Sequence, residues 1–427
     1  MLNNLLSFIF ETLYRVGITL YSVAARLLAL RQTKAKLFVQ GRQEIWTTLA
    51  QKQLKKKTNR RPTLWVHAAS LGEFDQARPV IEALKARDPL LWVVVSFFSP
   101  SGYTQRKNYP LADAVVYLPL DTPRNARKFL AAVQPDYIIF VKYEFWYFIL
   151  REVFRQKIPI YLIAATFRPQ QMFFAWYGRF FAALLPQFSL IFTQKTSDAE
   201  LLAQHGIINT LVAGDPRIDR SLSVAQEARS LPIVASFAAK NPLLIAGSTW
   251  LPDEDLLIAA MPDLQKMDAK LRFVIVPHEI NDAKIKALQK KLPYPSVRYT
   301  KVENGDFAAL DTSDVLIIDT VGVLAVVYRY GRLAYIGGAF GGGLHNIIEA
   351  AVFGLPIAFG NKNYQKFLES GELINLSAAA AVGNATDLVQ FYQKNYAPEP
   401  YVHLQNNINQ YISANKNATE RIVSKLP

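Results

Sequence analysis

Asn346 and Glu349 stand directly behind a loop that holds five glycines in the seven residues 337–343. An apolar run before the loop predicts a buried strand, and a helix is expected over 345–353, ended by Gly354. The N-terminus of a helix attracts anions, and glycines let a ligand approach the backbone closely. The i, i+3 spacing puts Asn346 and Glu349 on one helix face, where the carboxylate could accept both hydroxyls of a ribose. The alternative is that the pair only caps and charges the helix.

Glu73 offers acid–base chemistry in the first half of the chain. It lies one turn into a helix that is predicted to follow a strand over 64–68. A sheltered carboxylate in this position could take the proton of a hydroxyl group, and Asp75 is a second candidate base. However, Ser70-x-x-Glu73 is also the pattern of a capping box, in which Glu73 accepts the Ser70 N–H. Both interpretations stay open, whereas His67, inside the strand, is expected to be buried and hydrogen-bonded.

The elements that must position these residues form two series. Apolar runs alternate with helical stretches from residue 63 onwards, which is typical of parallel, doubly wound sheets. A helical passage over 220–240 separates the series, so we expect two Rossmann-like domains. The predicted strands are 64–68, 91–96, 114–118, 137–141, 159–164, 190–193 and 210–213 in the first series, and 243–246, 272–276, 315–319, 333–336 and 355–359 in the second.

Ligands of open α/β sheets bind beyond the carboxyl ends of the strands. Small and hydroxyl residues follow the strands of the second series, as a nucleotide phosphate site requires. Pro277-His278 could contact that phosphate or form a simple strand-end turn. The five histidines show no metal-ligand spacing, and no cysteine is present, which excludes disulfides, thiolate catalysis and cysteine-bound metal. We therefore expect neither a metal nor a cofactor.

The net charge of +14 is concentrated at the start of the chain. Residues 1–61 hold twelve Lys or Arg and two acidic residues, and twelve minus two gives +10. Such a charge could serve nucleic acid, but the apolar, helical run over 2–30 in the same segment favours an anionic membrane surface. Because charged residues interrupt the run, we expect an interfacial anchor rather than a clean spanning helix. The alternative is an amphipathic helix packed on its own domain.

In this order and spacing, several motifs resemble those of the 3-deoxy-D-manno-octulosonic acid (Kdo) transferases of bacterial lipid A assembly. The resemblance covers almost the whole chain. It rests on Trp65-Val-His-Ala-Ala-Ser-Leu-Gly-Glu73, Tyr143-Glu-Phe-Trp146, Gly247-Ser-Thr249, Asp319-Thr320 and His345-Asn-Ile-Ile-Glu349. The sequence departs from the family pattern where Leu344 replaces a glycine, where Val323 replaces an acidic residue, and where Pro-Arg-His is reduced to Pro277-His278.

The resemblance implies a GT-B fold, in which two Rossmann-like domains face a central cleft. It also implies an inverting transfer of Kdo from CMP-Kdo to a lipid A precursor (lipid IVA), with Glu73 as the catalytic base, on the cytoplasmic face of the bacterial inner membrane. The donor would bind Ser248, Thr249, Pro277, His278, Gly322, Gly343, His345, Asn346 and Glu349. Ser70, Gly72, Glu144 and Arg168 would bind the acceptor or support the site.

The expected division of the chain follows from these assignments. Residues 1–61 form the membrane-associated segment, 62–225 the acceptor domain, 226–397 the CMP-sugar donor domain and 398–427 a helical tail able to pack back on the first domain. Two other functions stay open. One is a UDP-sugar-dependent GT-B transferase acting on another lipid, and the other is a membrane-bound nucleotide or sugar sensor without enzymatic activity.

Overall fold

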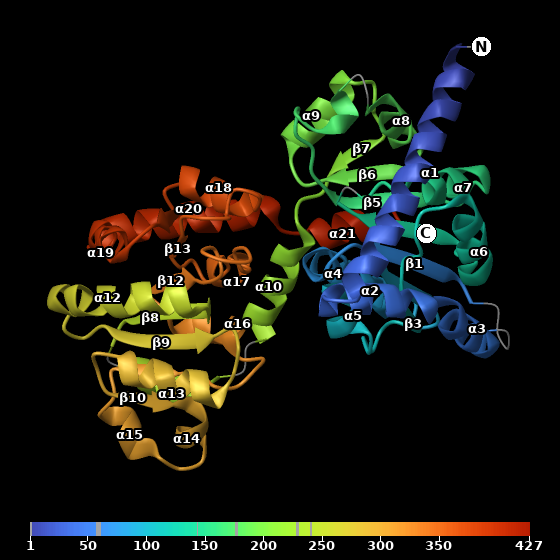
Figure 1. Cartoon of the computed structure of the whole chain (residues 1–427). Helices are drawn as coiled ribbons and strands as arrows, with labels where there is room; N and C mark the ends of the chain where they lie inside the picture. The colour runs from blue at the N-terminus through green and yellow to red at the C-terminus, as the bar shows by residue number, and fades with distance from the viewer. Residues whose placement is uncertain (1, 57–60, 143, 176–177, 228–229, 240) are drawn as a thin grey trace. The chain divides into compact units, whose positions relative to one another are not determined.

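A computed structural model describes residues 2–56, 61–142, 144–175, 178–227, 230–239 and 241–427 (Figure 1). The chain forms two compact units. Unit 1 comprises residues 1–219 together with 417–427, and unit 2 comprises residues 220–416. Each unit is built on a parallel sheet of seven strands.

The sheet of unit 1 has the strand order β3-β2-β1-β4-β5-β6-β7. Its strands are β1 (Thr63–Ala68), β2 (Trp92–Phe97), β3 (Ala114–Tyr117), β4 (Tyr137–Val141), β5 (Ile160–Ala165), β6 (Leu190–Thr193) and β7 (Thr210–Val212). Every residue of the central strands β1 and β4 is buried, since helices cover both faces of the sheet. The helices of this unit are α1 (Leu2–Ala29), α2 (Thr33–Gln43), α3 (Ile45–Lys56), α4 (Leu71–Arg87), α5 (Pro100–Arg106), α6 (Pro123–Val133), α7 (Tyr147–Arg155), α8 (Arg179–Ala182), α9 (Thr196–Gln204) and α21 (Ala418–Val423).

The sheet of unit 2 has the strand order β10-β11-β9-β8-β12-β13-β14. Its strands are β8 (Leu243–Thr249), β9 (Arg272–Pro277), β10 (Ser296–Arg298), β11 (Val315–Ile317), β12 (Leu333–Ile336), β13 (Ile357–Gly360) and β14 (Ala379–Val382). The helices of this unit are α11 (Pro232–Ala238), α12 (Leu251–Met267), α13 (Asp282–Lys291), α14 (Tyr299–Glu303), α15 (Phe307–Asp311), α16 (Leu324–Val327), α17 (Ile348–Ala351), α18 (Leu368–Asn375), α19 (Ala385–Lys394) and α20 (Pro398–Asn415). Helix α10 (Pro216–Glu227) begins in unit 1 and ends in unit 2.

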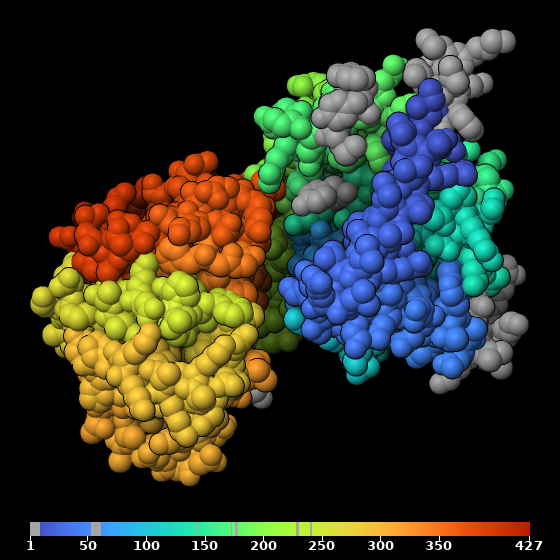
Figure 2. All heavy atoms as spheres, in the orientation of Figure 1, coloured from blue at the N-terminus to red at the C-terminus, as the bar shows by residue number. Residues whose placement is uncertain are grey.

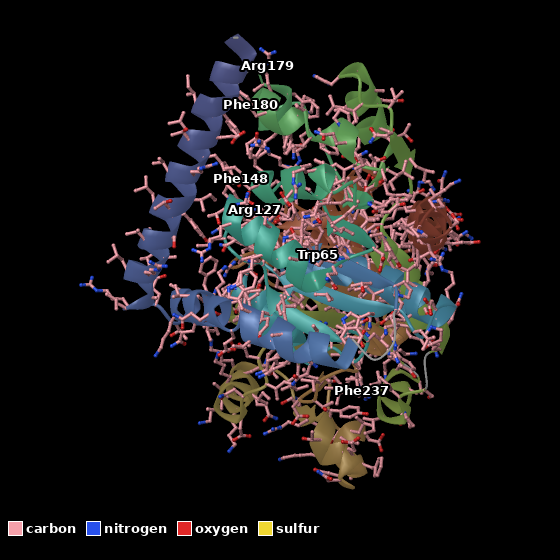
Figure 3. The ribbon with its side chains drawn as sticks, turned by 90° about the vertical axis from the view of Figure 1, so that its right-hand side faces the viewer. Trp65, Arg127, Phe148, Arg179, Phe180 and Phe237 are labelled. Atoms are coloured by element: carbon pink, nitrogen blue, oxygen red, sulfur yellow. The ribbon has the colours of Figure 1, made fainter. Side chains whose placement is uncertain are left out.

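Helix α1 packs on unit 1 along one of its sides. The ring of Phe10 stacks on Phe180, with centroids 4.3 Å apart, and Tyr14 meets Phe148 edge-on at 5.5 Å. Figure 3 shows Phe148 and Phe180 beside this helix. The Tyr14 hydroxyl also donates to the buried Asp121 carboxylate at 2.7 Å. The helix therefore packs on its own domain, which was the alternative to the expected interfacial anchor, and membrane anchoring stays a prediction.

The opposite side of α1 is apolar and exposed. Leu13, Leu20 and Leu27 are 66%, 64% and 63% exposed, and the helix forms part of the surface of unit 1 in Figure 2. In the described part of the chain, no single helix is long and apolar enough to cross a membrane. The pair Ile9–Ala29 and Thr33–Gln43, bent by 120°, reaches that length and composition only together.

The C-terminal tail is divided between the two units. Helix α20 lies in unit 2, whereas α21 packs beside α4 in unit 1 (Figure 1). The Asp219 carboxylate accepts the backbone N–H groups of Asn417 and Thr419, at 2.5 and 2.6 Å. Only the last eleven residues therefore return to the first unit.

The helix expected over 345–353 is shorter than predicted. Helix α17 comprises only Ile348–Ala351, and Gly354, with φ of +70°, follows its last turn. The His345 N–H bonds to the Gly337 carbonyl oxygen at 3.2 Å, which closes the glycine loop instead of starting a helix. The short strands β10 and β14 were not predicted. Strand β10 holds a single apolar residue, and β14 is mostly alanine, which is depleted in strands.

Candidate active site

Glu73 sits at the turn between β1 and α4 and fulfils the capping role that its sequence pattern predicts. Its Oε2 accepts the Ser70 N–H at 2.7 Å and the Ser70 hydroxyl at 2.9 Å. Burial and, to a smaller extent, the negative charge of Glu144 raise the pKa of the Glu73 carboxyl. A carboxylate that is costly to keep ionised has a stronger tendency to accept a proton. Capping and a role as a general base are thus compatible in this geometry.

Glu144 belongs to a polar cluster at the ends of β1 and β4. The Trp146 indole N–H points at Glu144 Oε2, 2.9 Å away, and at His67 Nε2, 3.1 Å away. His67 is fully buried, and its Nδ1 lies 3.1 Å from the Ser96 carbonyl oxygen. Since Nε2 faces an N–H donor, the imidazole proton belongs on Nδ1, where that carbonyl accepts it. The expectation of a buried, hydrogen-bonded His67 is confirmed.

Lys142, a cation whose charge acts on Glu73, was missed from the sequence. Lys142 has a left-handed backbone, with φ of +63°, and its charge lowers the pKa of both Glu73 and Asp215. Burial alone would raise the pKa of Asp215, but Arg217, whose Nη2 lies 2.6 Å from the carboxylate, holds it below its usual value. The position of Lys142, directly after β4, was the available signal.

Two of the predicted supporting residues do not join this cluster. The Arg168 side chain is exposed, and its backbone N–H bonds to Gln171 Oε1 at 3.1 Å. Among the described residues, neither Glu73 nor Glu144 has a hydrogen bond or ion pair with Arg168. A Cβ at Gly72 would meet no atom within 4 Å, so packing does not require a glycine there. The structure therefore gathers Ser70, Glu73 and Glu144, and leaves the roles of Arg168 and Gly72 as predictions.

In unit 2, the turn after β8 lies directly against the glycine loop. A Cβ at Gly337 would lie 2.3 Å from the Ser248 carbonyl oxygen, so only glycine fits at this crossing. Ser248 itself has a left-handed φ of +54°. The Thr249 hydroxyl is 3.2 Å from Glu254 Oε1 and is buried. Of the two predicted phosphate contacts, Ser248 has the more accessible side chain.

Asp253 joins this turn to the glycine loop, and the sequence reading missed it. Its buried carboxylate accepts the N–H groups of Trp250 and Gly338, each at 3.0 Å, and the Tyr335 hydroxyl at 2.9 Å. Burial raises the pKa of Asp253. Its place in the first turn of a predicted helix, three residues after Trp250, was the signal that could have found it.

Three aromatic rings stack at the ends of β8, β9 and β12. Trp250 lies over His278 with centroids 4.6 Å apart, and His278 lies over His345 at 4.4 Å. The Trp250 indole N–H also donates to His345 Nε2 at 3.2 Å. Burial lowers the pKa of His278, while burial and the neighbouring His278 lower that of His345 to about 4. Both predicted histidines therefore meet as neutral rings beside Pro277, the last residue of β9.

Asn346 and Glu349 meet as the i, i+3 spacing predicts. Asn346 Nδ2 donates to Glu349 Oε1 at 3.2 Å, and Asn346 Oδ1 accepts the Ile348 N–H in a turn just before α17. The N-cap of α17 is Ile347, which has no side-chain capping bond, so the two predicted residues meet at the loop without capping the helix.

The remaining glycines leave room beside this loop. Gly322 and Gly343 have φ of +86° and +133°. A Cβ at Gly343 would lie 3.5 Å from Nζ of Lys366, a cation that the sequence reading missed. The described residues contain no group of three or more His, Asp or Glu side chains that could hold a metal ion.

Comparison with known proteins finds Kdo transferases. Residues 43–220 match the family model described as 3-deoxy-D-manno-octulosonic-acid transferase (kdotransferase). Curated relatives with the name 3-deoxy-D-manno-octulosonic acid transferase align along most of the chain. The chain is therefore similar to Kdo transferases over most of its length.

The Kdo transferase of Aquifex aeolicus is 27% identical over 340 residues, which are 78% of this chain and 85% of that protein. The Kdo transferase of Rickettsia felis is 28% identical over an alignment that covers 77% of this chain and 70% of that protein. Among solved structures, the UDP-GlcNAc 2-epimerase of Neisseria meningitidis has a TM-score of 0.59 at 17% identity, covering 85% of this chain and 98% of that one. A putative UDP-N-acetylglucosamine 2-epimerase of Listeria monocytogenes has a TM-score of 0.58 at 14% identity, covering 85% and 95%. These structures support the predicted GT-B-like fold.

Proposed function

We propose that this glycosyltransferase moves Kdo from CMP-Kdo to a lipid A precursor with inversion at the anomeric carbon. The observation that carries the proposal is the half-buried Glu73, just after β1 in the unit that matches the family model, whose pKa is raised by burial and by the charge of Glu144. Glu73 takes the proton of a sugar hydroxyl on the acceptor. The hydroxyl oxygen then bonds to the anomeric carbon while the bond to CMP breaks, so CMP leaves with the electron pair.

The donor is assigned to unit 2, in keeping with the site predicted from the sequence. Ser248 and the glycine loop offer backbone and hydroxyl groups to the CMP phosphate, and His278 lies beside them. Asn346 and Glu349 offer hydrogen-bonding groups to the ribose diol. Lys366, next to Gly343, supplies a positive charge where the arginine of the family motif is missing. These groups would stabilise the leaving phosphate through hydrogen bonds and charge.

A transfer assay with CMP-Kdo and a lipid A precursor, read by product mass, tests the proposal. The wild-type chain should form the Kdo-bearing product, and Glu73→Gln should lower kcat by about 10²- to 10⁴-fold. Calorimetry should show unchanged CMP binding by this variant, which separates a lost base from lost donor binding. Near-wild-type turnover by Glu73→Gln would refute the assignment of the base.

The two other functions give different results in the same experiments. A UDP-sugar-dependent transferase would bind UDP in preference to CMP. A sensor would bind a nucleotide and form no product.

We further propose that α1 docks the enzyme on the cytoplasmic face of the inner membrane. The support is its exposed apolar side, formed by Leu13, Leu20 and Leu27, in a segment of high positive charge. Deleting the helix would also remove Phe10 and Tyr14, which pack on unit 1. The sharper variant is Leu13→Gln with Leu20→Gln, which should lose vesicle pelleting while keeping the melting temperature of the wild type. Unchanged pelleting would contradict this docking.

A further inference from the structure

A small cavity lies between α1 and α2 in unit 1, outside the candidate active site. It has a volume of about 180 Å³, which is room for several water-sized groups. The ionisable residues of its wall are Arg26 from α1 and Arg42 from α2, and Ser22 and Gln43 add hydrogen-bonding groups. Phe38, Val39 and Leu120 supply apolar surface. Within the described part of the chain, no acidic residue lines the cavity.

Arg42 is a half-buried cation without an acidic partner among the described residues. Its guanidinium lies 3.5 Å from the centroid of the Phe38 ring, and its two terminal nitrogens donate to the carbonyl oxygens of Phe38 and Phe98, at 3.1 and 2.9 Å. Its Nε is buried and has no hydrogen-bond partner. Burial lowers the pKa of Arg42 to about 9, so it stays protonated at neutral pH. A buried charge of this kind is costly unless an anion joins it.

The residues that line the cavity favour a phosphate group as the bound anion. Two guanidinium groups, a hydroxyl and an amide suit a compact group with several acceptor oxygens, and Arg pairs well with phosphate. The apolar residues around them suit a phosphate attached to a larger, partly apolar molecule. Arg26 is exposed on α1, the helix that also carries the apolar stripe of Leu13, Leu20 and Leu27.

We propose that the cavity between α1 and α2 binds a phosphate monoester, held by Arg26 and Arg42, at the end of a lipid. This inference rests on the proposed membrane docking and names the site at which a headgroup would be recognised. Arg42 also leads towards the candidate active site, because its guanidinium lies over the Phe98 ring, 4.8 Å from the centroid, and that ring lies 4.5 Å from the ring of Trp146. A lipid bound in the cavity would therefore lie close to the Glu144 cluster, connected to it through the contact between Phe98 and Trp146.

The first experiment measures binding of the full-length protein to phosphatidylcholine vesicles. One set contains phosphatidic acid, a phosphate monoester, and another contains phosphatidylglycerol, a diester, at matched surface charge. The wild type should prefer phosphatidic acid by about tenfold. Arg26→Gln should abolish that preference. Arg31→Gln removes an exposed positive charge outside the cavity and should keep the preference, even if overall binding weakens.

The second experiment separates a lipid headgroup from free phosphate. Inorganic phosphate is titrated against the wild type and against Arg26→Gln while the melting temperature is followed, with sulfate-free chloride buffer at constant ionic strength as reference. Stabilisation of the wild type alone supports a site that takes free phosphate, and a vesicle preference without this stabilisation supports a lipid-bound group. Absence of both effects, or equal effects of Arg26→Gln and Arg31→Gln, overturns the proposal.

Arg26 and Gln43 are better positions for substitution than Arg42. Arg42→Gln would break the bond from α2 to Phe98 and so disturb folding, whereas Arg26 and Gln43 stand at the wall without that role. Gln43→Ala should weaken the same preference as Arg26→Gln. Neither measurement depends on glycosyl transfer, so a failed transfer assay leaves the inference standing. The phosphate titration likewise survives a failure of membrane docking.

Discussion

The negative charge of Glu144 acts on Glu73, where it adds to the effect of burial and raises the pKa of the Glu73 carboxyl. Removal of that charge in Glu144→Gln should lower the pKa of Glu73, so the base stays ionised to lower pH. The acidic limb of the pH profile of kcat/KM should therefore move to lower pH. Glu82→Gln, which changes an exposed carboxylate of the same helix, should leave the limb in place. A limb that does not move in Glu144→Gln would show that another group is the base.

Gly337 is the position in the glycine loop at which an added side chain would clash most closely with the neighbouring backbone. Gly337→Ala puts a Cβ 2.3 Å from the Ser248 carbonyl oxygen, so the β8 turn and the loop must move apart. We expect a loss of about 1–3 kcal/mol in stability and weaker CMP binding. Gly342→Ala is the matched control, because its Cβ would meet nothing within 4 Å. Denaturant unfolding and calorimetry check both variants, and equal behaviour of the two would contradict the close approach.

Asp253→Ala should destabilise unit 2 through lost hydrogen bonds. The substitution leaves the N–H groups of Trp250 and Gly338 and the Tyr335 hydroxyl without their acceptor. Stranded buried donors cost about 1–3 kcal/mol each, so we expect a total loss of several kcal/mol, on the order of 3 or more. Asp255→Ala removes an exposed ion pair with Lys291 and should cost about 1 kcal/mol or less. Thermal unfolding of both variants provides the comparison.

His345 should make stability depend on pH. Its pKa in the folded state, about 4, lies below the usual 6.5, so the unfolded chain binds more protons between these values. Its contribution is present above pH 6.5 and is lost as the pH falls to 4, by at most about 3 kcal/mol. His345→Gln should flatten the slope of stability against pH in that window. His403→Gln, at an exposed position of α20, should keep it; calorimetric scans at a series of pH values measure both.

Much of the fold could be predicted because its strands are buried on both faces. Continuous apolar runs such as Tyr137–Val141 and Leu333–Ile336 mark strands without ambiguity, and the structure has them at those bounds. The end of the glycine loop could not be predicted in this way. Asn346 binds the Ile348 N–H through its side chain, and this local hydrogen bond delays the helix.

The candidate site was predictable where function depends on neighbours in sequence, and less so where it depends on long-range contacts. Ser70 and Glu73 are three residues apart, and their contact follows from helix geometry. Trp250 and His345 are 95 residues apart, and only the adjacency of their strands brings them together. No spacing in the sequence indicates that stack.

The bonds from Asp219 to Asn417 and Thr419 have a consequence for how the polypeptide is threaded. The chain leaves unit 1 after Asp219 and re-enters it at Asn417, so the exit and the return are fastened to one carboxylate. Unit 2 is thus an insertion whose two ends are tied at a single point of unit 1. A protease cut between α10 and α11 would leave two fragments held together by noncovalent contacts alone, and the last eleven residues would have to detach from unit 1 before the fragments could separate.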